Sequence, residues 1–206
     1  MRPILILLCL LTVSMQLQAE VPHRNSFGVR TSLAGYGLAV TSVQAMDRIG
    51  GELGTFSFQA RLSKAITPTH QVQIDVTRYT RRSLESWARS SRYRVAWSYR
   101  WQSSDVSWST TVRLGHRDVP GSQHQRAEVS LQASKDFGNW SPYLSGQVRY
   151  HLTDSYLLTR RVNLGTNYAL AEAWTMGLYL RHGQTKRVGL WDSPSAVLGN
   201  SLSLRF

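Results

Sequence analysis

The chain alternates apolar and polar residues in segments of about ten residues, a pattern with the period of a β-strand that has one apolar face. In the segment 92–101, Tyr93, Val95 and Trp97 share one face while Arg92, Arg94 and Ser98 share the other. The alternation recurs at 55–64, 71–79, 106–115, 127–134, 141–150, 160–168 and 174–182. Such segments are typical of a transmembrane β-barrel.

Two less regular segments complete the set. The first strand is predicted near 26–40, where the chain is glycine-rich and a bulge is expected at Gly35 to Gly37. The last strand covers the end of the chain at 198–206. The total is about ten strands, within a range of about eight to twelve, and single-chain bacterial barrels have an even number. The sequence predicts an all-β fold, a transmembrane antiparallel up-and-down β-barrel.

The connections alternate in length, which supports the strands independently. Tight turns are predicted at 67–70, 102–105, 136–139 and 169–173. Longer connections are predicted near 41–52, 80–91, 116–126 and 183–196, whereas 151–158 is short for its side. Short periplasmic turns and longer extracellular loops are expected of an outer-membrane barrel.

Aromatic residues gather at the predicted strand ends, as they do in the interfacial girdles of membrane barrels. Those beside the short turns are Trp101, Trp108, Phe137, Trp140, Tyr168, Trp174 and Phe206. Those near the longer loops are Tyr79, Trp87, Tyr93, Tyr150 and Tyr156. A soluble sandwich would place its tryptophans at strand centres, where only Trp97 is expected.

The last strand ends on an aromatic residue. Leu202, Leu204 and Phe206 lie on one face of the sequence NSLSLRF. This ending resembles the C-terminal signal of Gram-negative outer-membrane barrels. The resemblance implies that the barrel assembly machinery recognises these three residues, and that the strand then pairs with the first one so that no edge is exposed.

The beginning of the chain has the pattern of a secretory signal peptide. A short basic start is followed by an apolar run from Ile4 to Val13, which is too short to span a bilayer, and Ala19 offers a cleavage point. We therefore expect residues 1–19 to be removed and 20–206 to form a single outer-membrane barrel domain. The cleaved segment contains Cys9, the only cysteine, so neither a disulfide nor a thiolate is expected in the mature chain.

The chain is strongly basic, with a formal net charge of +12. If apolar residues face lipid, the opposite face lines the lumen, and it collects Arg30, Arg61, Arg92, Arg94, Arg100, Arg113, Arg149, Arg161 and Arg181 against the acids Asp75 and Glu128. Arginine suits carboxylates and phosphates, so this lumen is predicted to bind or pass anions. Two other interpretations remain: an internal ion-pair plug, and binding of lipid headgroups by Arg81, Arg82, Arg89 and Arg117 on the long loops.

The C-terminal third carries three short motifs that support a family resemblance. They are Asn139-Trp140-Ser141-Pro142-Tyr143, the run from Arg161 to Tyr168, and the ending Ser203-Leu204-Arg205-Phe206. In these motifs the chain is similar to the oligogalacturonate-specific porins. The resemblance implies uptake of acidic oligosaccharides through an arginine-lined pore, although that family has a twelve-strand barrel and about ten strands are counted here.

An enzyme is the alternative to a channel. His116, Asp118, Ser122 and His124 are predicted in one long loop, and His151, Asp154, His182 and Asp192 lie at the same end. A His–carboxylate pair there could support hydrolysis or lipid modification. No local motif fixes a catalytic residue, the histidines have no metal-ligand spacing, and no cofactor motif is visible, so we predict no catalytic site, metal or cofactor.

The sequence therefore predicts a monomeric barrel in the outer membrane of a Gram-negative bacterium, in contact with outer-membrane lipid and lipopolysaccharide. Its expected function is a narrow anion-selective porin that passes or binds small acidic solutes, with acidic oligosaccharides among the candidates. Nucleic acid is not expected as a partner, because the charges are spread over alternating strands. A structural or adhesion barrel that acts through its extracellular loops is the third possibility.

Overall fold

A computed structural model describes residues 22–46, 53–83, 86–119, 122–153, 156–187, 190–191 and 195–206. The strands are β1 His23–Leu33, β2 Tyr36–Met46, β3 Leu53–Ala65, β4 His70–Ser83, β5 Ser86–Ser103, β6 Val106–Val119, β7 Ser122–Lys135, β8 Trp140–His151, β9 Tyr156–Ala169, β10 Trp174–Arg187, β11 Leu190–Trp191 and β12 Ser195–Arg205. Among these residues no helix is long and apolar enough to cross a membrane. The expected signal segment, 1–19, lies outside the described residues, so its cleavage stays a prediction.

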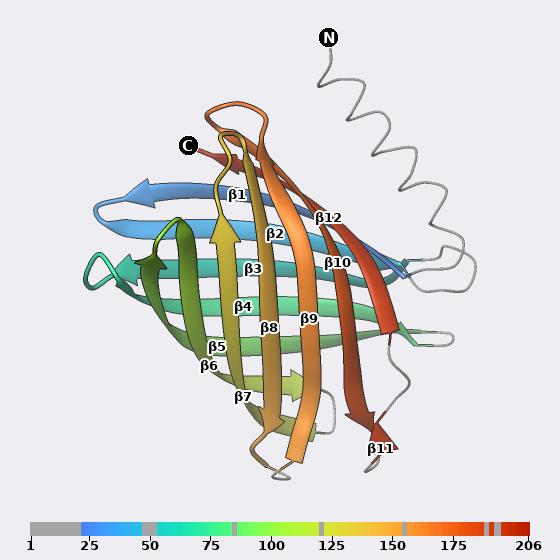
Figure 1. Ribbon diagram of the computed structural model, residues 1–206. Helices are drawn as coiled ribbons and strands as arrows, with labels where there is room; N and C mark the ends of the chain where they lie inside the picture. The colour runs from blue at the N-terminus through green and yellow to red at the C-terminus, as the bar shows by residue number, and fades with distance from the viewer. Residues whose placement is uncertain are drawn as a thin grey trace.

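The strands close into a barrel (Figure 1). Consecutive strands from β1 to β10 pair antiparallel, β10 pairs also with β12, and β12 pairs with β1. Within the described part of the chain, β11 pairs only with β10 and stands outside the closed ring. The predicted β-barrel, and the pairing of its last strand with its first, are confirmed.

The closing pair is parallel, because the ring contains one strand more than the ten expected. His23 lies opposite Leu198 and Arg30 opposite Arg205, so β1 and β12 run in the same direction. Eleven strands lie within the range that the sequence predicts, but the expected even number, and with it a wholly antiparallel closure, are wrong.

The extra strand comes from the segment 26–40, which is a hairpin and not one bulged strand. The chain reverses at Ala34 and Gly35, whose φ angles are 50° and 78°. Two successive residues with positive φ form the tight turn that matches the twist of a β-hairpin, and glycine adopts this conformation without steric cost. The register then continues without interruption from Leu33–Tyr36 to His23–Met46.

The two ends of the barrel differ less than the sequence suggests. The short-turn end carries the links 34–35, 66–69, 104–105, 136–139 and 170–173, which confirms all four predicted tight turns. At the opposite end, which we call the long-loop end, β4 and β5 pair as far as Ser83–Ser86 and β6 and β7 as far as Val119–Ser122. The long loops predicted near 80–91 and 116–126 are therefore wrong, because backbone pairing continues where the apolar alternation fades.

Burial in this molecule is inverted relative to a soluble protein. Among the described residues Ala96 is the one hydrophobic residue that is buried, whereas Asp75, Thr77, Ser98 and Glu128 are buried polar residues. Large apolar side chains lie exposed on the outer wall, among them Phe58, Leu62, Ile74, Val95, Leu114, Leu144, Leu164 and Leu180. An apolar exterior around a polar interior is the arrangement of a barrel whose solvent is lipid.

Candidate functional site

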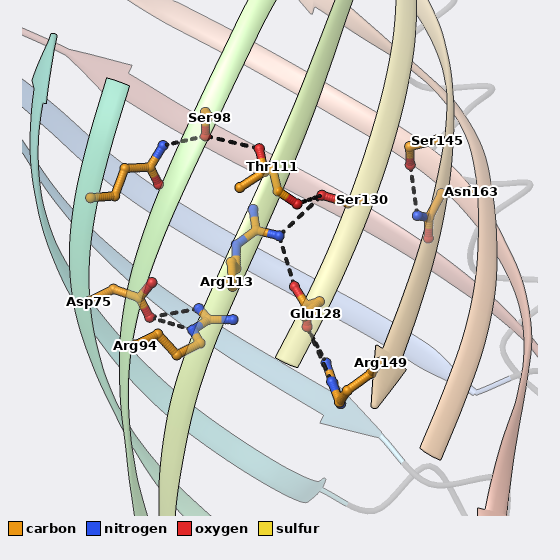
Figure 2. Close-up of polar contacts among 11 residues, drawn as sticks. Asp75, Arg94, Ser98, Thr111, Arg113, Glu128, Ser130, Ser145, Arg149 and Asn163 are labelled. Carbon is orange, nitrogen blue, oxygen red and sulfur yellow. Dashed lines mark hydrogen bonds and ion pairs between the residues drawn. The ribbon is translucent and has the colours of Figure 1, made fainter. Parts of the chain in front are cut away.

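The lumen contains two buried acids, Glu128 on β7 and Asp75 on β4. Glu128 of β7 is 5% exposed and lies between Arg113 of β6 and Arg149 of β8 in the register. Arg113 Nη1 donates to Oε1 at 2.8 Å, and Arg149 Nη2 donates to Oε2 at 2.8 Å (Figure 2). One carboxylate is thus shared by two guanidinium groups, so this group of three carries a net positive charge.

The second acid, Asp75 of β4, is 1% exposed and lies between Arg61 and Arg94 in the register. Arg94 donates to Asp75 Oδ1 from both Nε and Nη2, each at 2.7 Å (Figure 2). Arg94 can lie along the wall because its neighbour on β6 is Gly115, where a Cβ would stand 2.8 Å from Arg94 Cγ. Arg61 forms no ion pair within the described residues, and its Nε is buried without a hydrogen-bond partner.

Neutral polar side chains connect the strands between the charges. Ser98 Oγ lies 2.9 Å from Thr111 Oγ1, and Arg113 Nη1 also donates to Ser130 Oγ at 3.2 Å. On the next wall Asn163 Nδ2 donates to Ser145 Oγ at 2.9 Å (Figure 2). These bonds hold the lumen side chains in fixed positions, which a preorganised ion site requires.

Several lumen arginines gather around a small cavity toward the long-loop end. A cavity of about 20 Å³ remains there, and we call its surroundings the arginine constriction. Its lining includes Arg92, Arg94, Arg113, Arg117, Arg126, Glu128 and Arg149. A volume of this size holds about one water molecule. The side chains around this cavity are therefore closely packed, and most of them are cations.

The lumen is wider at the short-turn end. One hollow there has a volume of about 420 Å³, and its polar lining includes Arg30, Asn139, Glu172, Thr175 and Arg205. A second, of about 260 Å³, shares Arg30 and Arg205 and adds Arg61, Gln71 and Arg100. Arg100 Nη2 donates to Gln71 Oε1 at 2.8 Å. Both hollows present arginine side chains to solvent.

The remaining predicted lumen residues lie on the wall formed by β9 and β10. Arg181 Nε donates to Asn163 Oδ1 at 2.7 Å, and its guanidinium lies 5.2 Å from the centre of the Tyr179 ring. Arg161 lies opposite Gln147 and Gly183 in the register and forms no ion pair within the described residues. The structure therefore brings Arg94, Arg113 and Arg149 together and places Arg30, Arg61 and Arg100 at the short-turn end. Arg161 and Arg181 lie on β9 and β10, next to the strand that carries Arg149.

Two arginines of the constriction were not expected in the lumen from the sequence, because the strands were predicted too short. Arg126 and Arg117 line the constriction, and Arg117 donates to Ser90 Oγ at 3.3 Å. The expectation that Arg117 binds lipid from a long loop is wrong. Its partner Tyr79 was expected in an aromatic belt, but the guanidinium groups of Arg92 and Arg117 lie 5.0 and 5.5 Å from its ring centre. If the predicted strands had been extended by a few residues, the same alternation would have placed both arginines in the lumen.

The long-loop end contains a hydrogen-bonded chain of three side chains. Ser122 Oγ lies 2.6 Å from His124 Nε2, and His124 Nδ1 lies 3.1 Å from His151 Nε2. His151 is 2% exposed. No His–carboxylate pair is formed here among the described residues: His116, Asp118 and His182 alternate out of phase with the lumen residues of their strands, and Asp154 and Asp192 lie outside the described residues.

In the part of the chain that the structure describes, no group of three or more histidine, cysteine, aspartate or glutamate side chains is placed to hold a metal ion. The groups that converge in the lumen are instead guanidinium donors, which bind anions.

These features define a β-barrel with an apolar wall and an arginine-rich interior. No protein-family model matches the sequence, and no curated protein is similar to it. Among solved structures the barrel is similar to an anion-selective porin from Comamonas acidovorans, with a TM-score of 0.41, 11% sequence identity, and coverage of 84% of this chain and 52% of that one. The chain thus spans about half the length of that porin, and the likeness is one of barrel fold.

Proposed function

We propose that the protein is a narrow anion-selective channel whose lumen binds and passes small acidic solutes. The observation that carries this proposal is the excess of arginine over acid in the lumen. Glu128 and Asp75 pair with Arg113, Arg149 and Arg94. Within the described residues, no ion pair is formed by Arg30, Arg61, Arg92, Arg100, Arg161 or Arg181. A closed ion-pair plug would need near balance of charge. An uncompensated positive lumen with low-dielectric walls concentrates anions and repels cations.

Arg61, Arg92 and Arg161 are the groups expected to contact a passing anion. Arg61 and Arg92 each have a buried Nε that lacks a hydrogen-bond partner, and none of the three forms an ion pair within the described residues. A guanidinium group with unused donors has both the charge and the directional N–H groups to hold a carboxylate or phosphate.

The volumes of the lumen cavities bear on the size of the solute. The hollows of about 420 and 260 Å³ at the short-turn end are close to the range of small-molecule sites, which is about 300–1,000 Å³. The arginine constriction, at about 20 Å³, is far narrower. These sizes favour a small anion or a single small acidic molecule over an acidic oligosaccharide, which would require the constriction to widen.

The same wall supports the proposed location. An apolar exterior and a polar lumen suit the outer membrane of a Gram-negative bacterium, where the protein would lie as a monomer among lipids and lipopolysaccharide. Leu202 and Leu204 are in phase on the outer face of β12, opposite the face of Ser201 and Ser203. Phe206 follows the last residue of β12 and is 74% exposed. This placement supports recognition of the last strand by the barrel assembly machinery.

The test compares two neighbouring arginines on opposite faces of β9. Arg161 is in phase with Asn163, which bonds to Ser145 in the lumen, whereas Arg160 is in phase with the exposed Val162 and Leu164 of the outer wall. Arg161→Gln and Arg160→Gln therefore remove the same charge from the two faces of one strand. In planar bilayers we expect Arg161→Gln to lower the chloride-to-potassium permeability ratio by about threefold, since the field along the lumen weakens. Arg160→Gln should leave the ratio unchanged.

Equal effects of the two substitutions, or no effect of either, would contradict a lumen that selects by its arginines. Folding of both variants is checked by the shift in electrophoretic mobility between unheated and heated samples in detergent.

A hydrolase at the long-loop end is a second candidate, favoured by the chain from Ser122 through His124 to His151. If His124 carries its proton on Nδ1 and donates it to His151 Nε2, its Nε2 is free to accept the proton of the Ser122 hydroxyl. This is the relation of nucleophile, base and orienting group found in serine hydrolases. The substrate class would be an ester or another acyl compound.

A fluorophosphonate probe tests this candidate, because it labels serines that a neighbouring base activates. Labelling of the folded wild type that is lost in Ser122→Ala supports a hydrolase. The matched control is Ser90→Ala, since Ser90 bonds to Arg117 and not to a histidine. Unlabelled wild-type barrel would remove the hydrolase from consideration.

A further inference from the structure

The outer wall between β7 and β10 contains a groove that the channel does not use. Its volume is about 600 Å³, and Val129, Leu131, Val148 and Val162 give it mostly apolar sides. Gly146 lies between Leu131 and Val162 in the register, and a Cβ added at Gly146 would meet no atom within 4 Å. The missing side chain therefore leaves an elongated space on the apolar band.

One end of this groove is polar. Arg160, His182 and Gln184 line it, and they come from the halves of β9 and β10 that lie toward the long-loop end. On the same two strands the outward residues nearer the short turns are apolar: Leu164 and Leu180 pair with each other and are 62% and 50% exposed. In the register the groove runs across the four strands, since Val148 pairs with Arg160 and Arg160 with Gln184. Its apolar side chains thus lie mainly on β7 and β8, and its polar side chains lie beside them on β9 and β10.

Arg160 is held in place at this boundary. Its Nε donates to Gln184 Oε1 at 2.8 Å, its Nη2 bonds to the same oxygen, and its guanidinium lies 4.8 Å from the centre of the Trp191 ring. It forms no ion pair within the described residues. A cation on the lipid-facing wall is costly without a counter-charge, and the anion available at this depth is the phosphate of a lipid.

We propose that this groove binds a phosphorylated lipid, with one acyl chain along Gly146 and the lipid phosphate on Arg160. The apolar sides match a hydrocarbon chain, and the fixed guanidinium group matches the headgroup charge. Arg160 keeps N–H donors beyond those that Gln184 engages, and a guanidinium group binds phosphate through two parallel N–H groups.

Native mass spectrometry of the full barrel, released from detergent in the presence of phosphatidylglycerol or phosphatidylcholine, tests the proposal. The wild type should retain one phosphatidylglycerol about tenfold more strongly than one phosphatidylcholine, because the phosphate of phosphatidylcholine is already paired with its own quaternary ammonium group and attracts Arg160 less. Arg160→Gln should remove this preference. Gly146→Leu should weaken both lipids, since the leucine side chain fills the groove, while Gly146→Ala should have little effect.

Arg161→Gln is the matched control, because it removes the same charge from the lumen face and should keep the preference. Loss of the preference in Arg161→Gln, or its persistence in Arg160→Gln, would overturn the proposal, since the preference would then follow net charge and not this groove. The proposal would also be overturned if inorganic phosphate, added at the same concentration as the lipid, abolished lipid binding. The acyl chain would then contribute nothing to the affinity.

Discussion

Replacing Glu128 with glutamine is expected to lower the free energy of unfolding by about 3 kcal/mol, the cost of breaking a buried ion pair. The side chain of Glu128 is 6% exposed, and those of Arg113 and Arg149 are 19% and 14% exposed, so solvent screens this group little. Without the carboxylate the two guanidinium groups repel each other across β7. Urea unfolding in lipid vesicles, followed by tryptophan fluorescence, measures the change.

The control is Asp105→Asn, which removes the Asp105–Lys135 pair at the short-turn end. The side chain of Asp105 is 80% exposed, and exposed pairs contribute at most about 1 kcal/mol. The Glu128→Gln barrel that still folds should also be more anion-selective than the wild type, because a negative charge has left the constriction. Equal stabilities of the two variants, or a shift of Glu128→Gln toward cations, would contradict the structure of the lumen.

Replacing Ser201 with proline is expected to prevent the barrel from closing. Ser201 lies in the middle of β12, where it pairs with Ser26 of β1 on one side and with Gly177 of β10 on the other. Proline removes the backbone N–H from whichever ladder it serves, and an unsatisfied partner inside a bilayer costs several kcal/mol. The folded form that resists unfolding in unheated detergent samples should be absent.

Leu190→Pro is the matched control for this closure. Leu190 belongs to β11, which pairs only with β10 among the described strands. The Leu190 residue is 77% exposed. This variant should fold as the wild type does. A folded Ser201→Pro barrel would show that β12 does not join β10 to β1.

Alternation alone was enough to predict the barrel wall and the side to which most lumen arginines point. The period of two is a property of each strand, so Arg94, Arg113 and Arg149 could be placed inside without knowledge of their neighbours. The prediction failed where the alternation fades. Arg117 and Arg126 lie toward the long-loop ends of β6 and β7. Polar residues occupy both faces of the strands there, and the pattern no longer separates strand from loop.

The strand count and the ion pairs depend on information that a pattern does not carry. A glycine in an alternating segment is compatible with a bulge and with a reversal, and the turn at Gly35 decides between ten strands and eleven. Glu128 meets Arg113 and Arg149 because the register places them side by side. Register is set jointly by every turn around the ring, so pairing of these groups could not be read from their spacing in the sequence.

The sign of the reversal potential of the wild-type barrel, in a planar bilayer separating two concentrations of potassium chloride, tests the central claim most directly. Chloride should carry most of the current, and the potential should shift toward the chloride equilibrium value. A reversal potential shifted toward the potassium equilibrium value would contradict an arginine-lined anion channel. The absence of current from barrels that the heat-dependent mobility shift shows to be folded would also contradict it.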